Sequence, residues 1–502
     1  MRACCKGTES VSLKKTLKSV CKKIHQLKFV ENDVKAKSCS ADPDEVRPGD
    51  VFFALSEEDE VLEESVGLAI YRGCSAIVAD RPVTTGTDSV PYFIIPNVTE
   101  GFAVFCHAIR DYPGKSLKLI GITGTSGKTT TSYLISGMLA EAGFQVGLIG
   151  SLGIFDGQGF HVHAEPEMTP DQLVVWLDRM AMNGCTHVII EASSRMIVNG
   201  WLGGIQFDAV CLTNIRRDHL DFHKTVEQYR RSKLGIFKYA KKRALAICNI
   251  DDQISEAIVP LINQPLLSIG IRNQAEVGSM LVERFSGEQT FIVTAGTEAV
   301  SFRTKIIGDE FIYNCMMATA LGIGFEIDIK TIVRGIERVE NIPGRMERIE
   351  CGQNFNVYID SARTADSLAA VLRTIREVTA GKLICVFGAA EYHDSAKRLL
   401  FGKTMSTLAD SVILTSASDR LNFETATAIC DIGKGFTLQN GVQIMPERAE
   451  AIAWALSEAV EGDSVVIFGK GEPSNTEHPD VIPFCDRHFA KQWLYENQTC
   501  SV

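Results

Sequence analysis

The 502-residue sequence predicts an α/β protein with three domains. At about 150 residues for each domain, a chain of this length is long enough for three. Apolar runs with strand character alternate with helical patterns, and this order is typical of parallel sheets that are covered by helices on both faces. Two breaks that contain Pro and Gly, "DYPGKS" at 111–116 and "ENIPGR" at 340–345, divide the chain into three parts.

The first part, residues 1–112, is predicted to be a small α/β domain. Its short strands are "DVFFAL", "CSAIVAD" and "PYFIIPN", with acidic or helical stretches between them. The last part, residues 344–502, alternates strands and helices again, with "NVYIDSA", "KLICVFGA", "DSVILTSA" and "DSVVIFGKG" as the strands. We therefore expect the last part to be a Rossmann-like domain.

The middle part, residues 113–343, is predicted to contain a mostly parallel sheet, with strands "KLIGIT", "THVIIEA", "FDAVCLTNI" and "RALAICNI". The first of these strands is followed by a Gly-rich turn and by a helix predicted over 129–142. A turn of this kind presents free backbone N–H groups and the positive end of the helix dipole to an anion. The sequence therefore predicts a phosphate-binding loop formed by Gly124, Thr125, Ser126, Gly127, Lys128, Thr129 and Thr130.

Two side chains of this loop suit a nucleotide bound with Mg²⁺. Lys128 can reach the outer phosphates, and the Thr129 hydroxyl can ligate the metal ion. The match to the common pattern GxxxxGK[ST] is incomplete, because Ile122 stands where that pattern has Gly. The alternative interpretation is an ordinary Gly-rich turn between a strand and a helix.

The composition excludes several classes of protein. Hydrophobic residues make up 45% of the chain and charged residues 23%, which is ordinary for a soluble globular protein. The net charge of −11 argues against a broad nucleic-acid surface. No apolar run approaches the roughly 20 residues of a membrane span, and the N-terminus lacks a secretory signal. The 15 cysteines are scattered through apolar strands, which is typical of buried, reduced thiols. We therefore expect a cytoplasmic protein that binds neither nucleic acid nor membrane.

Acidic and imidazole side chains follow two strands of the middle part. Glu191 ends "THVIIE", so its carboxylate is expected at the carboxyl edge of the sheet, where ligands bind. The segment "TNIRRDHLDFH" follows the next strand and contains Asp218, His219, Asp221 and His223. The alternatives are a surface carboxylate that ends a strand and a solvated polar loop.

The segment "YRRSKLGIF", residues 229–237, is predicted to be helical, with Tyr229, Lys233 and Phe237 at positions i, i+4 and i+8. A surface lysine that lies along an aromatic face would explain this pattern without any function. The order of the motifs, however, indicates a family.

The sequence resembles the Mur ligase family, and most closely its UDP-N-acetylmuramyl tripeptide synthetase branch. The matching segments follow one another along nearly the whole chain: "EVRPGDVFFAL", "TGTSGKTTT", "MTPDQL", "EASS", "TNIRRDHLDFH", "YRRSKLGIF", "ICNIDD", "PGRMERIE", "YIDSARTADSLAAVL", "FGKGEP" and "PFCDR". Each segment is short, but the ordered set is highly specific. The resemblance implies a uridine-nucleotide-binding domain, a central ATP-binding domain and a C-terminal domain that binds the acceptor amino acid.

The resemblance also implies a reaction and a set of residues. By this resemblance, ATP would phosphorylate the terminal carboxylate of a UDP-muramyl peptide, and the amine of an amino acid, meso-diaminopimelate or another diamino acid, would attack the acyl phosphate. The implied catalytic residues are Lys128, Glu191, His219 and Lys233, and the implied Mg²⁺ ligands are Thr129, Glu191, His219 and a carbamylated Lys233. ATP would contact the phosphate loop, Asn314, Arg345 and Asp360. The substrates would contact Thr169, Pro170, Asp171, Ser193, Ser194, Arg420, Gly469 and Glu472. The resemblance further implies a monomer that acts in peptidoglycan precursor synthesis.

The chain departs from the family pattern in both substrate regions. The family's Ser-Ser-His reads Ser193-Ser194-Arg195, an arginine that follows it in the family is Trp201, and the first of two threonines is Met168. In the C-terminal region, Asp-Tyr-Ala-His-Thr-Pro-Asp reads "DSARTAD" at 360–366. The signature Asp-Asn-Pro-Arg reads "ASDR" at 417–420, Gly-Lys-Gly-His-Glu reads "GKGEP" at 469–473, and "EYH" at 391–393 replaces a Gly-Gly-Asp-Arg segment. The implied ATP and metal residues are all present.

Three alternatives to a ligase of this branch stay open. The first is a carboxylate–amine ligase of the same superfamily that acts on another substrate, although "EVRPGDVFFAL" speaks against it. The second is a non-catalytic paralogue, which the altered substrate regions would explain. The third is a generic P-loop ATPase or kinase, which the lack of a Walker-B-like aspartate pattern disfavours.

Overall fold

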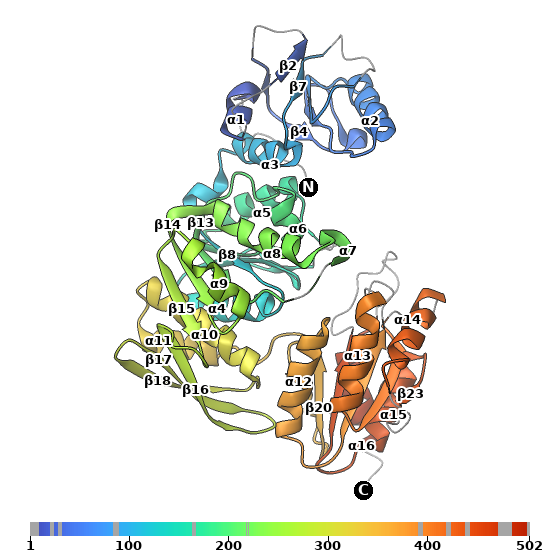
Figure 1. Cartoon of the computed structure of the whole chain (residues 1–502). Coiled ribbons are helices and arrows are strands. Elements are labelled where there is room, and N and C mark those ends of the chain that lie inside the picture. Colours follow the sequence, from blue (N-terminus) through green and yellow to red (C-terminus); the bar gives the residue numbers. More distant parts are fainter. Residues whose placement is uncertain are drawn as a thin grey trace.

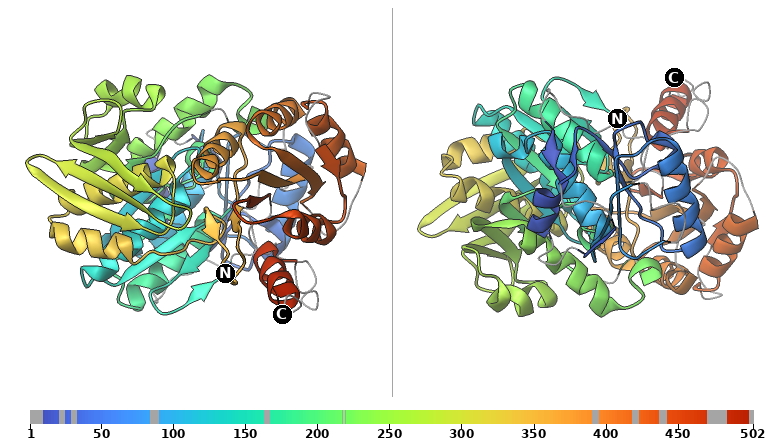
Figure 2. Two further views of the ribbon diagram at one scale, coloured as in Figure 1. Left: turned by 90° about the horizontal axis from the view of Figure 1, so that it is seen from below. Right: turned by 90° about the horizontal axis from the view of Figure 1, so that it is seen from above.

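The structure is a computed structural model that describes residues 10–20, 25–28, 33–83, 90–162, 167–216, 218, 220–389, 395–417, 423–436, 442–469 and 484–498. Three main sheets and the two-stranded ribbon of β1 and β3 are formed by the described strands. Figure 1 shows the sheets as three successive bodies, and Figure 2 shows that the N-terminal body lies over the junction of the other two. The predicted α/β class with three domains is confirmed.

The N-terminal sheet has the strand order β2-β7-β6-β5-β4, in which only the β2–β7 pair is antiparallel. The predicted strands correspond to β5, β6 and β7, and Val51, Phe53, Ala76 and Val78 are fully buried in the core. The elements are β1 (Val11–Ser12), α1 (Leu13–Val20), β2 (His25–Lys28), β3 (Lys35–Ala36), β4 (Cys39–Ser40), η1 (Pro43–Glu45), β5 (Val51–Phe53), α2 (Asp59–Tyr71), β6 (Ala76–Ala79), β7 (Tyr92–Ile94) and α3 (Val98–Ile109).

The central sheet has the order β11-β10-β9-β12-β8-β13-β14-β15-β16-β17-β18. It is parallel from β9 to β16, as predicted, and antiparallel at both edges. Its strands are β8 (Lys118–Thr123), β9 (Val146–Gly150), β10 (Gly153–Phe155), β11 (Phe160–His161), β12 (His187–Glu191), β13 (Phe207–Leu212), β14 (Ala240–Asn249), β15 (Leu266–Gly270), β16 (Val277–Arg284), β17 (Gln289–Ala295) and β18 (Glu298–Thr304).

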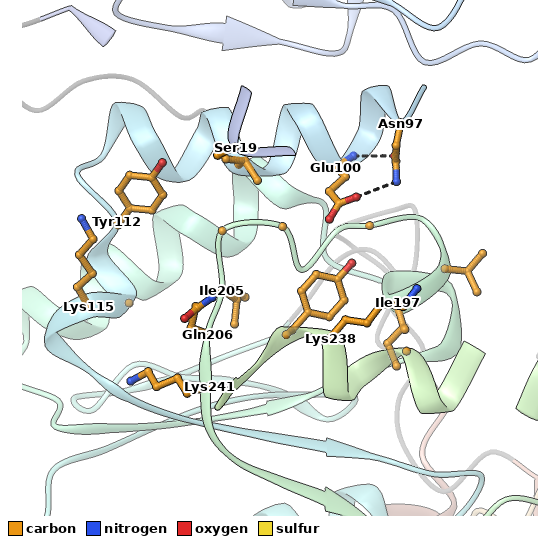
Figure 3. Close-up of a pocket in the computed structure, with 18 residues that line it drawn as sticks. Ser19, Asn97, Glu100, Tyr112, Lys115, Ile197, Ile205, Gln206, Lys238 and Lys241 are labelled. Carbon is orange, nitrogen blue, oxygen red and sulfur yellow. Dashed lines mark hydrogen bonds between the residues drawn. The ribbon is translucent and has the colours of Figure 1, made fainter. Parts of the chain in front are cut away.

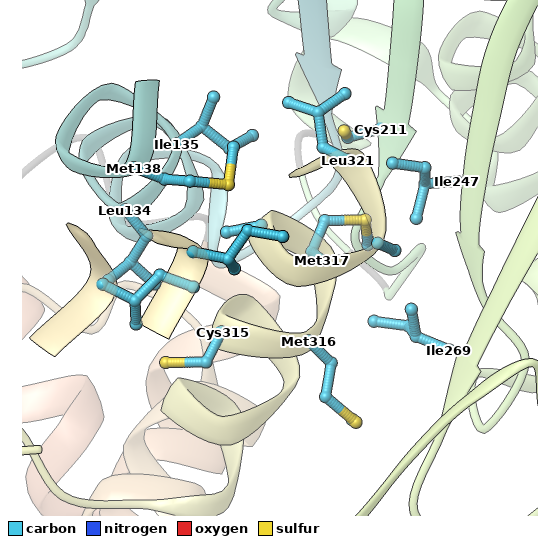
Figure 4. Close-up of a cluster of buried hydrophobic side chains, with 14 of the residues drawn as sticks. Leu134, Ile135, Met138, Cys211, Ile247, Ile269, Cys315, Met316, Met317 and Leu321 are labelled. Carbon is cyan, nitrogen blue, oxygen red and sulfur yellow. The ribbon is translucent and has the colours of Figure 1, made fainter. Parts of the chain in front are cut away.

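Helices cover both faces of the central sheet. On one face, Leu134 and Met138 pack with Met317 and Leu321 against strands β13 to β15 (Figure 4). On the other face, Leu173 and Leu177 pack among Leu119, Val188 and Phe207. The described helices and 3₁₀ turns are η3 (Pro113–Ser116), α4 (Lys128–Glu141), α5 (Pro170–Met182), α6 (Ser194–Val198), α7 (Leu220–His223), α8 (Val226–Leu234), η4 (Gly235–Tyr239), α9 (Gln253–Ile258), η5 (Val259–Leu261), α10 (Asp309–Gly324) and α11 (Ile329–Glu337).

Two helices differ from their predicted extent. α4 begins at Lys128, one residue earlier than predicted, so the lysine itself is in the first turn. The predicted helix 229–237 ends at Leu234, and the chain continues as the 3₁₀ turn η4. Phe237 therefore does not share a helical face with Tyr229 and Lys233, because the 3₁₀ turn has a tighter winding than the α-helix.

The C-terminal sheet has the order β19-β20-β24-β21-β22-β23, and it is parallel except for the β19–β20 pair. The four predicted strands correspond to β20, β21, β22 and β24. The elements are β19 (Glu347–Arg348), β20 (Asn356–Asp360), α12 (Ala365–Glu377), β21 (Leu383–Ala389), α13 (Ser395–Leu408), β22 (Ser411–Ser416), α14 (Phe423–Gly433), β23 (Val442–Ile444), α15 (Arg448–Glu458), β24 (Ser464–Phe468) and α16 (Asp486–Gln498).

A cavity of about 730 Å³ lies between the N-terminal and central domains. Its described lining comes from α1, α3, η3, α6 and the loop after it, η4 and the start of β14. The lining includes Glu100, Tyr112, Lys115, Lys238 and Lys241 (Figure 3). None of the residues predicted to act in catalysis or to bind ATP, metal or substrate is among the described lining of this cavity. In the described part of the chain, no helix is both long and apolar enough to cross a membrane.

Candidate active site

The phosphate loop connects β8 to α4 through two glycines with positive φ angles. Gly127 has φ +85° and immediately precedes α4. A Cβ atom there would lie 2.5 Å from Oδ1 of Asn314 on α10, and a Cβ atom on Gly124 would overlap the Thr213 hydroxyl. Both positions therefore require glycine for conformation and for space. The side chain of Asn314, which the resemblance assigns to ATP, lies against this loop and accepts a hydrogen bond from Thr131 Oγ1 at 3.1 Å.

The Lys128 ammonium folds back over the loop. Its Nζ donates to the carbonyl oxygens of Gly124 at 2.8 Å and Thr125 at 3.1 Å. Burial lowers the pKa of Lys128 and nearby arginines lower it further, whereas the carboxylates of Glu191 and Asp218 act in the opposite direction. A phosphate that enters the loop can therefore replace the two carbonyl groups as the partner of this ammonium.

Glu191 lies at the carboxyl end of β12, directly beside the phosphate loop. β12 pairs in parallel with β8, so the end of each strand lies at the same edge of the sheet. Thr129 Oγ1 donates to Glu191 Oε2 at 2.9 Å, and Ser132 Oγ donates to Glu191 Oε1 at 3.1 Å. Gly150, at the end of β9, leaves the space that the carboxylate needs, because a Cβ atom there would overlap Glu191 Oε1.

These oxygen atoms fit a magnesium ion. The Thr129 hydroxyl and the Glu191 carboxylate are hard ligands, they lie within hydrogen-bond distance of each other, and Ser151 Oγ lies 2.9 Å from Thr129 Oγ1. Among the described residues, no group of three or more His, Cys, Asp and Glu side chains could hold a metal ion. A metal ion at this position would therefore depend on hydroxyl groups, on nucleotide phosphates or on ligands beyond the described set. His219 lies outside the described residues.

The loop after β13 supports the phosphate loop through contacts that the sequence did not reveal. Ser126 N donates to Asn214 Oδ1 at 3.1 Å, and Thr213 Oγ1 donates to the Ser126 carbonyl at 2.6 Å. Arg216 N donates to Thr125 Oγ1 at 2.9 Å. In the sequence, the only indication of these residues was that they belong to the segment "TNIRRDHLDFH". Their contacts with the phosphate loop could not be predicted, because these contacts depend on β8 and β13 being neighbours in the sheet.

Lys233 is deeply buried on α8, with 2% of the residue exposed. Its Nζ lies 5.5 Å from the centroid of the Tyr229 ring, and the Tyr229 hydroxyl lies 3.0 Å from Thr125 Oγ1 of the phosphate loop. Burial lowers the pKa of Lys233 well below its usual range and the charge of Lys128 adds to this effect, whereas Asp218 and Glu167 oppose it. The surface-lysine alternative is therefore wrong for this residue, and burial favours a neutral amine.

Arg345 of the C-terminal domain approaches the phosphate loop, and Asp360 holds the turn that carries Arg345. Arg345 Nη2 lies 3.3 Å from Thr129 Oγ1, and the same guanidinium donates to the side chain of Ser361. Asp360 is buried and accepts hydrogen bonds from the backbone N–H groups of Met346 and Ala362, each at 2.8 Å. Burial raises the pKa of Asp360. Met346 is the neighbour of Arg345, so this carboxylate fixes the turn, and the predicted contact of Asp360 with ATP stays a prediction.

The residues predicted to bind the muramyl peptide lie at the N-termini of two helices. Thr169 forms a capping box with Gln172 at the start of α5, where Pro170 and Asp171 occupy the first turn. Ser193 caps α6 by accepting from Met196 N at 3.1 Å, and Ser194 Oγ lies 2.9 Å from Nε2 of His223. Ser193 and Ser194 lie two and three residues after Glu191 along the chain. Asp171, in the first turn of α5, faces a different neighbour: it lies within electrostatic range of Cys106 on α3, in the N-terminal domain.

The predicted acceptor residues are described only in part. Gly469 follows β24 and has φ +114°, and a Cβ atom there would lie 2.9 Å from the Gly388 carbonyl oxygen. Arg420 and Glu472 lie outside the described residues, as do Glu391, Asp419 and Pro473. Nearby, the buried Arg448 donates to both carboxylate oxygens of Asp486 at 2.7 Å, which joins α15 to α16.

One further contact, also absent from the sequence predictions, joins the C-terminal domain to this site. Lys397 Nζ on α13 forms an ion pair with Asp218 Oδ1 at 2.6 Å, and both side chains are largely shielded from solvent. Asp218 belongs to the segment after β13, one position before His219 in the sequence.

The three-domain fold and the phosphate loop with its buried carboxylate and lysine define a class of nucleotide-dependent ligase, and comparisons with known proteins place the chain within it. Residues 122–322 match the model of the Mur ligase middle domain, and residues 344–471 match that of the Mur ligase glutamate ligase domain. A relative from Geobacillus thermodenitrificans (strain NG80-2), a UDP-N-acetylmuramoyl-L-alanyl-D-glutamate--2,6-diaminopimelate ligase, is 32% identical. The alignment covers 90% of this chain and 94% of that protein.

Solved structures show the same fold. A UDP-N-acetylmuramoyl-L-alanyl-D-glutamate--2,6-diaminopimelate ligase has a TM-score of 0.68 at 23% identity, over 98% of this chain and 99% of that chain. The MurF ligase of Thermotoga maritima in complex with ADP has a TM-score of 0.60 at 17% identity, over 91% of this chain and 96% of that chain. The chain belongs to the Mur ligase family.

Proposed function

We propose that the chain is an ATP-dependent ligase that adds an amino acid, meso-diaminopimelate or another diamino acid, to UDP-N-acetylmuramoyl-L-alanyl-D-glutamate. The observation that carries this proposal is the contact of Thr129 and Glu191 beside the phosphate loop, with the buried Lys233 on the neighbouring helix α8. The substrates are proposed because a relative with that printed activity is aligned over 90% of the chain. Such an enzyme would act in the cytoplasm as a monomer, in peptidoglycan precursor synthesis.

In the first step, the γ-phosphoryl group passes from ATP to an oxygen atom of the substrate carboxylate, which forms an acyl phosphate and ADP. The backbone N–H groups of 124–130 and the Lys128 ammonium would hold the phosphates, and Arg345 would approach them from the C-terminal domain. Bound Mg²⁺ would neutralise charge on the phosphates. In this chain, the ligands would be Thr129, Glu191, the carbamylated Lys233 and His219, with His219 at a second magnesium site.

The proposed modification of Lys233 follows from its environment. A carbamate forms when a neutral amine adds to carbon dioxide and loses a proton, and burial favours the neutral amine. The product is an anion on a long side chain, which suits a magnesium ion better than an ammonium group does.

In the second step, the amine of the incoming amino acid attacks the carbonyl carbon of the acyl phosphate, phosphate leaves with its bridging oxygen, and the nitrogen loses a proton. The protein contributes by positioning both substrates and by excluding water. The acceptor would lie at the carboxyl edge of the C-terminal sheet, at Gly469 and in the segments that contain Arg420 and Glu472.

The acceptor site is where we expect this chain to differ from its relatives. Arg420 can hold a distal carboxylate through two parallel hydrogen bonds, but Pro473 offers no side-chain acceptor to a distal ammonium group. An ammonium group that is buried without a partner binds poorly. We therefore predict weaker binding of meso-diaminopimelate than in a typical family member, with Glu391, Asp419 or Glu472 partly replacing the missing acceptor.

An ADP-release assay with UDP-N-acetylmuramoyl-L-alanyl-D-glutamate and a panel of amino acids tests the proposed function. Turnover with a diamino acid supports it. A micromolar KM for meso-diaminopimelate that is unchanged in Glu391→Ala, Asp419→Ala and Glu472→Ala would contradict the predicted weak binding. ATP binding without ligation of any amino acid would instead favour a non-catalytic paralogue.

A further inference from the structure

The ion pair between Lys397 and Asp218 links two domains at the proposed ATP site. Lys397 is the third residue of α13 in the C-terminal domain, and Asp218 lies between β13 and α7 in the central domain. Nζ and Oδ1 are 2.6 Å apart, and the side chains of the lysine and the aspartate are only 12% and 15% exposed. Because of this shielding, the pair differs from exposed surface ion pairs, which contribute little to the stability of a protein.

The position of Lys397 on its helix has no local explanation. A cation in the first turn of a helix faces the positive end of the helix dipole, so it does not stabilise α13. The next residue, Arg398, pairs within its own domain with Asp431 of α14 at 3.1 Å. Of these two neighbouring cations, Lys397 is therefore the one whose partner lies in another domain.

Asp218 in turn lies among the cations of the site. It is within electrostatic range of Lys128 in the first turn of α4 and of Lys233 on α8. The same stretch of chain supports the phosphate loop, because Arg216 N donates to Thr125 Oγ1 at 2.9 Å. A group that fixes Asp218 therefore also fixes the segment that supports the phosphate loop.

We propose that Lys397 is a positioning residue: when the C-terminal domain is docked, it holds Asp218 and so arranges the segment after β13 for phosphoryl transfer. The ATP site is then fully arranged only when the domain proposed to carry the amino acid is in place. This inference rests on the proposed function for its kinetic consequence, but its structural part can be tested without turnover.

The first test measures hydrogen–deuterium exchange in the ligand-free full-length protein. In Lys397→Met, backbone amides between β13 and α8 should exchange faster, because the segment loses its link to α13. Lys403→Met is the matched control, since Lys403 is an exposed lysine on the same helix, and it should leave this segment unchanged. Unchanged exchange in Lys397→Met, or acceleration confined to α13, would overturn the proposal.

The second test is a double-mutant cycle in the ligation assay. Lys397→Met should lower kcat by roughly tenfold or more with little change in the KM for ATP, and Lys397→Arg should recover part of the loss. When Lys397→Met is added to Asp218→Asn, kcat should fall little further, because the two residues act through one contact. Independent, multiplicative effects would overturn the proposed coupling. A protein that ligates no substrate but shows the exchange effect would contradict the proposed function and leave this inference standing.

Discussion

At the scale of single residues, Lys233 shows why burial matters for the chemistry. A charged ammonium at a position that is 2% exposed would need a close anion, yet the cation Lys128 lies within electrostatic range. A neutral amine, or a carbamate bound to Mg²⁺, resolves this conflict. Asp218 and Glu167 favour the charged form, so the balance depends on how these carboxylates are paired.

If Lys233 is carbamylated, Lys233→Ala should reduce ligation by at least about 100-fold, because a magnesium ligand is lost. Added short carboxylates such as formate or acetate should restore part of the activity by occupying the vacated ligand position. Steady-state ADP release measures both effects. Lys242→Ala, which removes an exposed lysine from β14, should have the same ligation activity as the protein without substitutions. Full activity of Lys233→Ala would contradict the assignment.

At the scale of elements, the carboxyl ends of β8, β9 and β12 together form the edge at which we propose that magnesium binds. β12 is paired with β9 on one side and β8 on the other, so Glu191, Gly150 and the phosphate loop meet at one place. Gly150 is required there because any side chain would enter the space of the Glu191 carboxylate.

Gly150→Ala should therefore displace the Glu191 carboxylate and lower kcat by about 10–100-fold, the usual cost of disturbing the groups that orient a metal ligand. The concentration of Mg²⁺ needed for half-maximal rate should rise at the same time. Gly67→Ala on α2 is a matched control, because a Cβ atom there meets nothing within 4 Å. An unchanged dependence of the rate on Mg²⁺ in Gly150→Ala would show that Glu191 is not a ligand.

The elements also show how far the sequence could lead. Most of the buried parallel strands and α4 were predicted, because continuous apolar runs and a Gly-rich turn are local signals, but the short parallel strands β9 and β15 were not. The antiparallel strands β16 to β18 were not predicted, since their partly exposed pattern differs from that of a buried parallel strand. Lys397 could not be found either, because its partner Asp218 lies 179 residues away and only the folded domains bring the two together.

At the scale of the whole molecule, the described contacts between the C-terminal and central domains include two separate sets. Near the phosphate loop, the contacts are Arg345 with Thr129 and Lys397 with Asp218. Farther away, the hairpin of β16 and β17 contacts the C-terminal domain: the Tyr358 hydroxyl donates to the Ser286 carbonyl at 2.6 Å, and Arg284 pairs with Glu377 at 2.5 Å. If the contacts near the phosphate loop were lost and those of the hairpin were kept, the C-terminal domain could rotate about the hairpin and open the site.

We therefore expect the C-terminal domain to move as a hinged body that closes on the central domain when substrates bind. Small-angle X-ray scattering should show a smaller radius of gyration with Mg²⁺, a non-hydrolysable ATP analogue and the UDP-muramyl dipeptide than without ligands. The structure described here, with both sets of contacts formed, should fit the ligand-bound curve. Lys397→Met should weaken this compaction and Lys403→Met should not. Of these two lysines of α13, Lys397 is the one that contacts the central domain. An identical scattering curve with and without ligands would contradict hinge closure. In that case the domains would already have their final arrangement before ATP binds, and the acceptor would bind to that fixed arrangement.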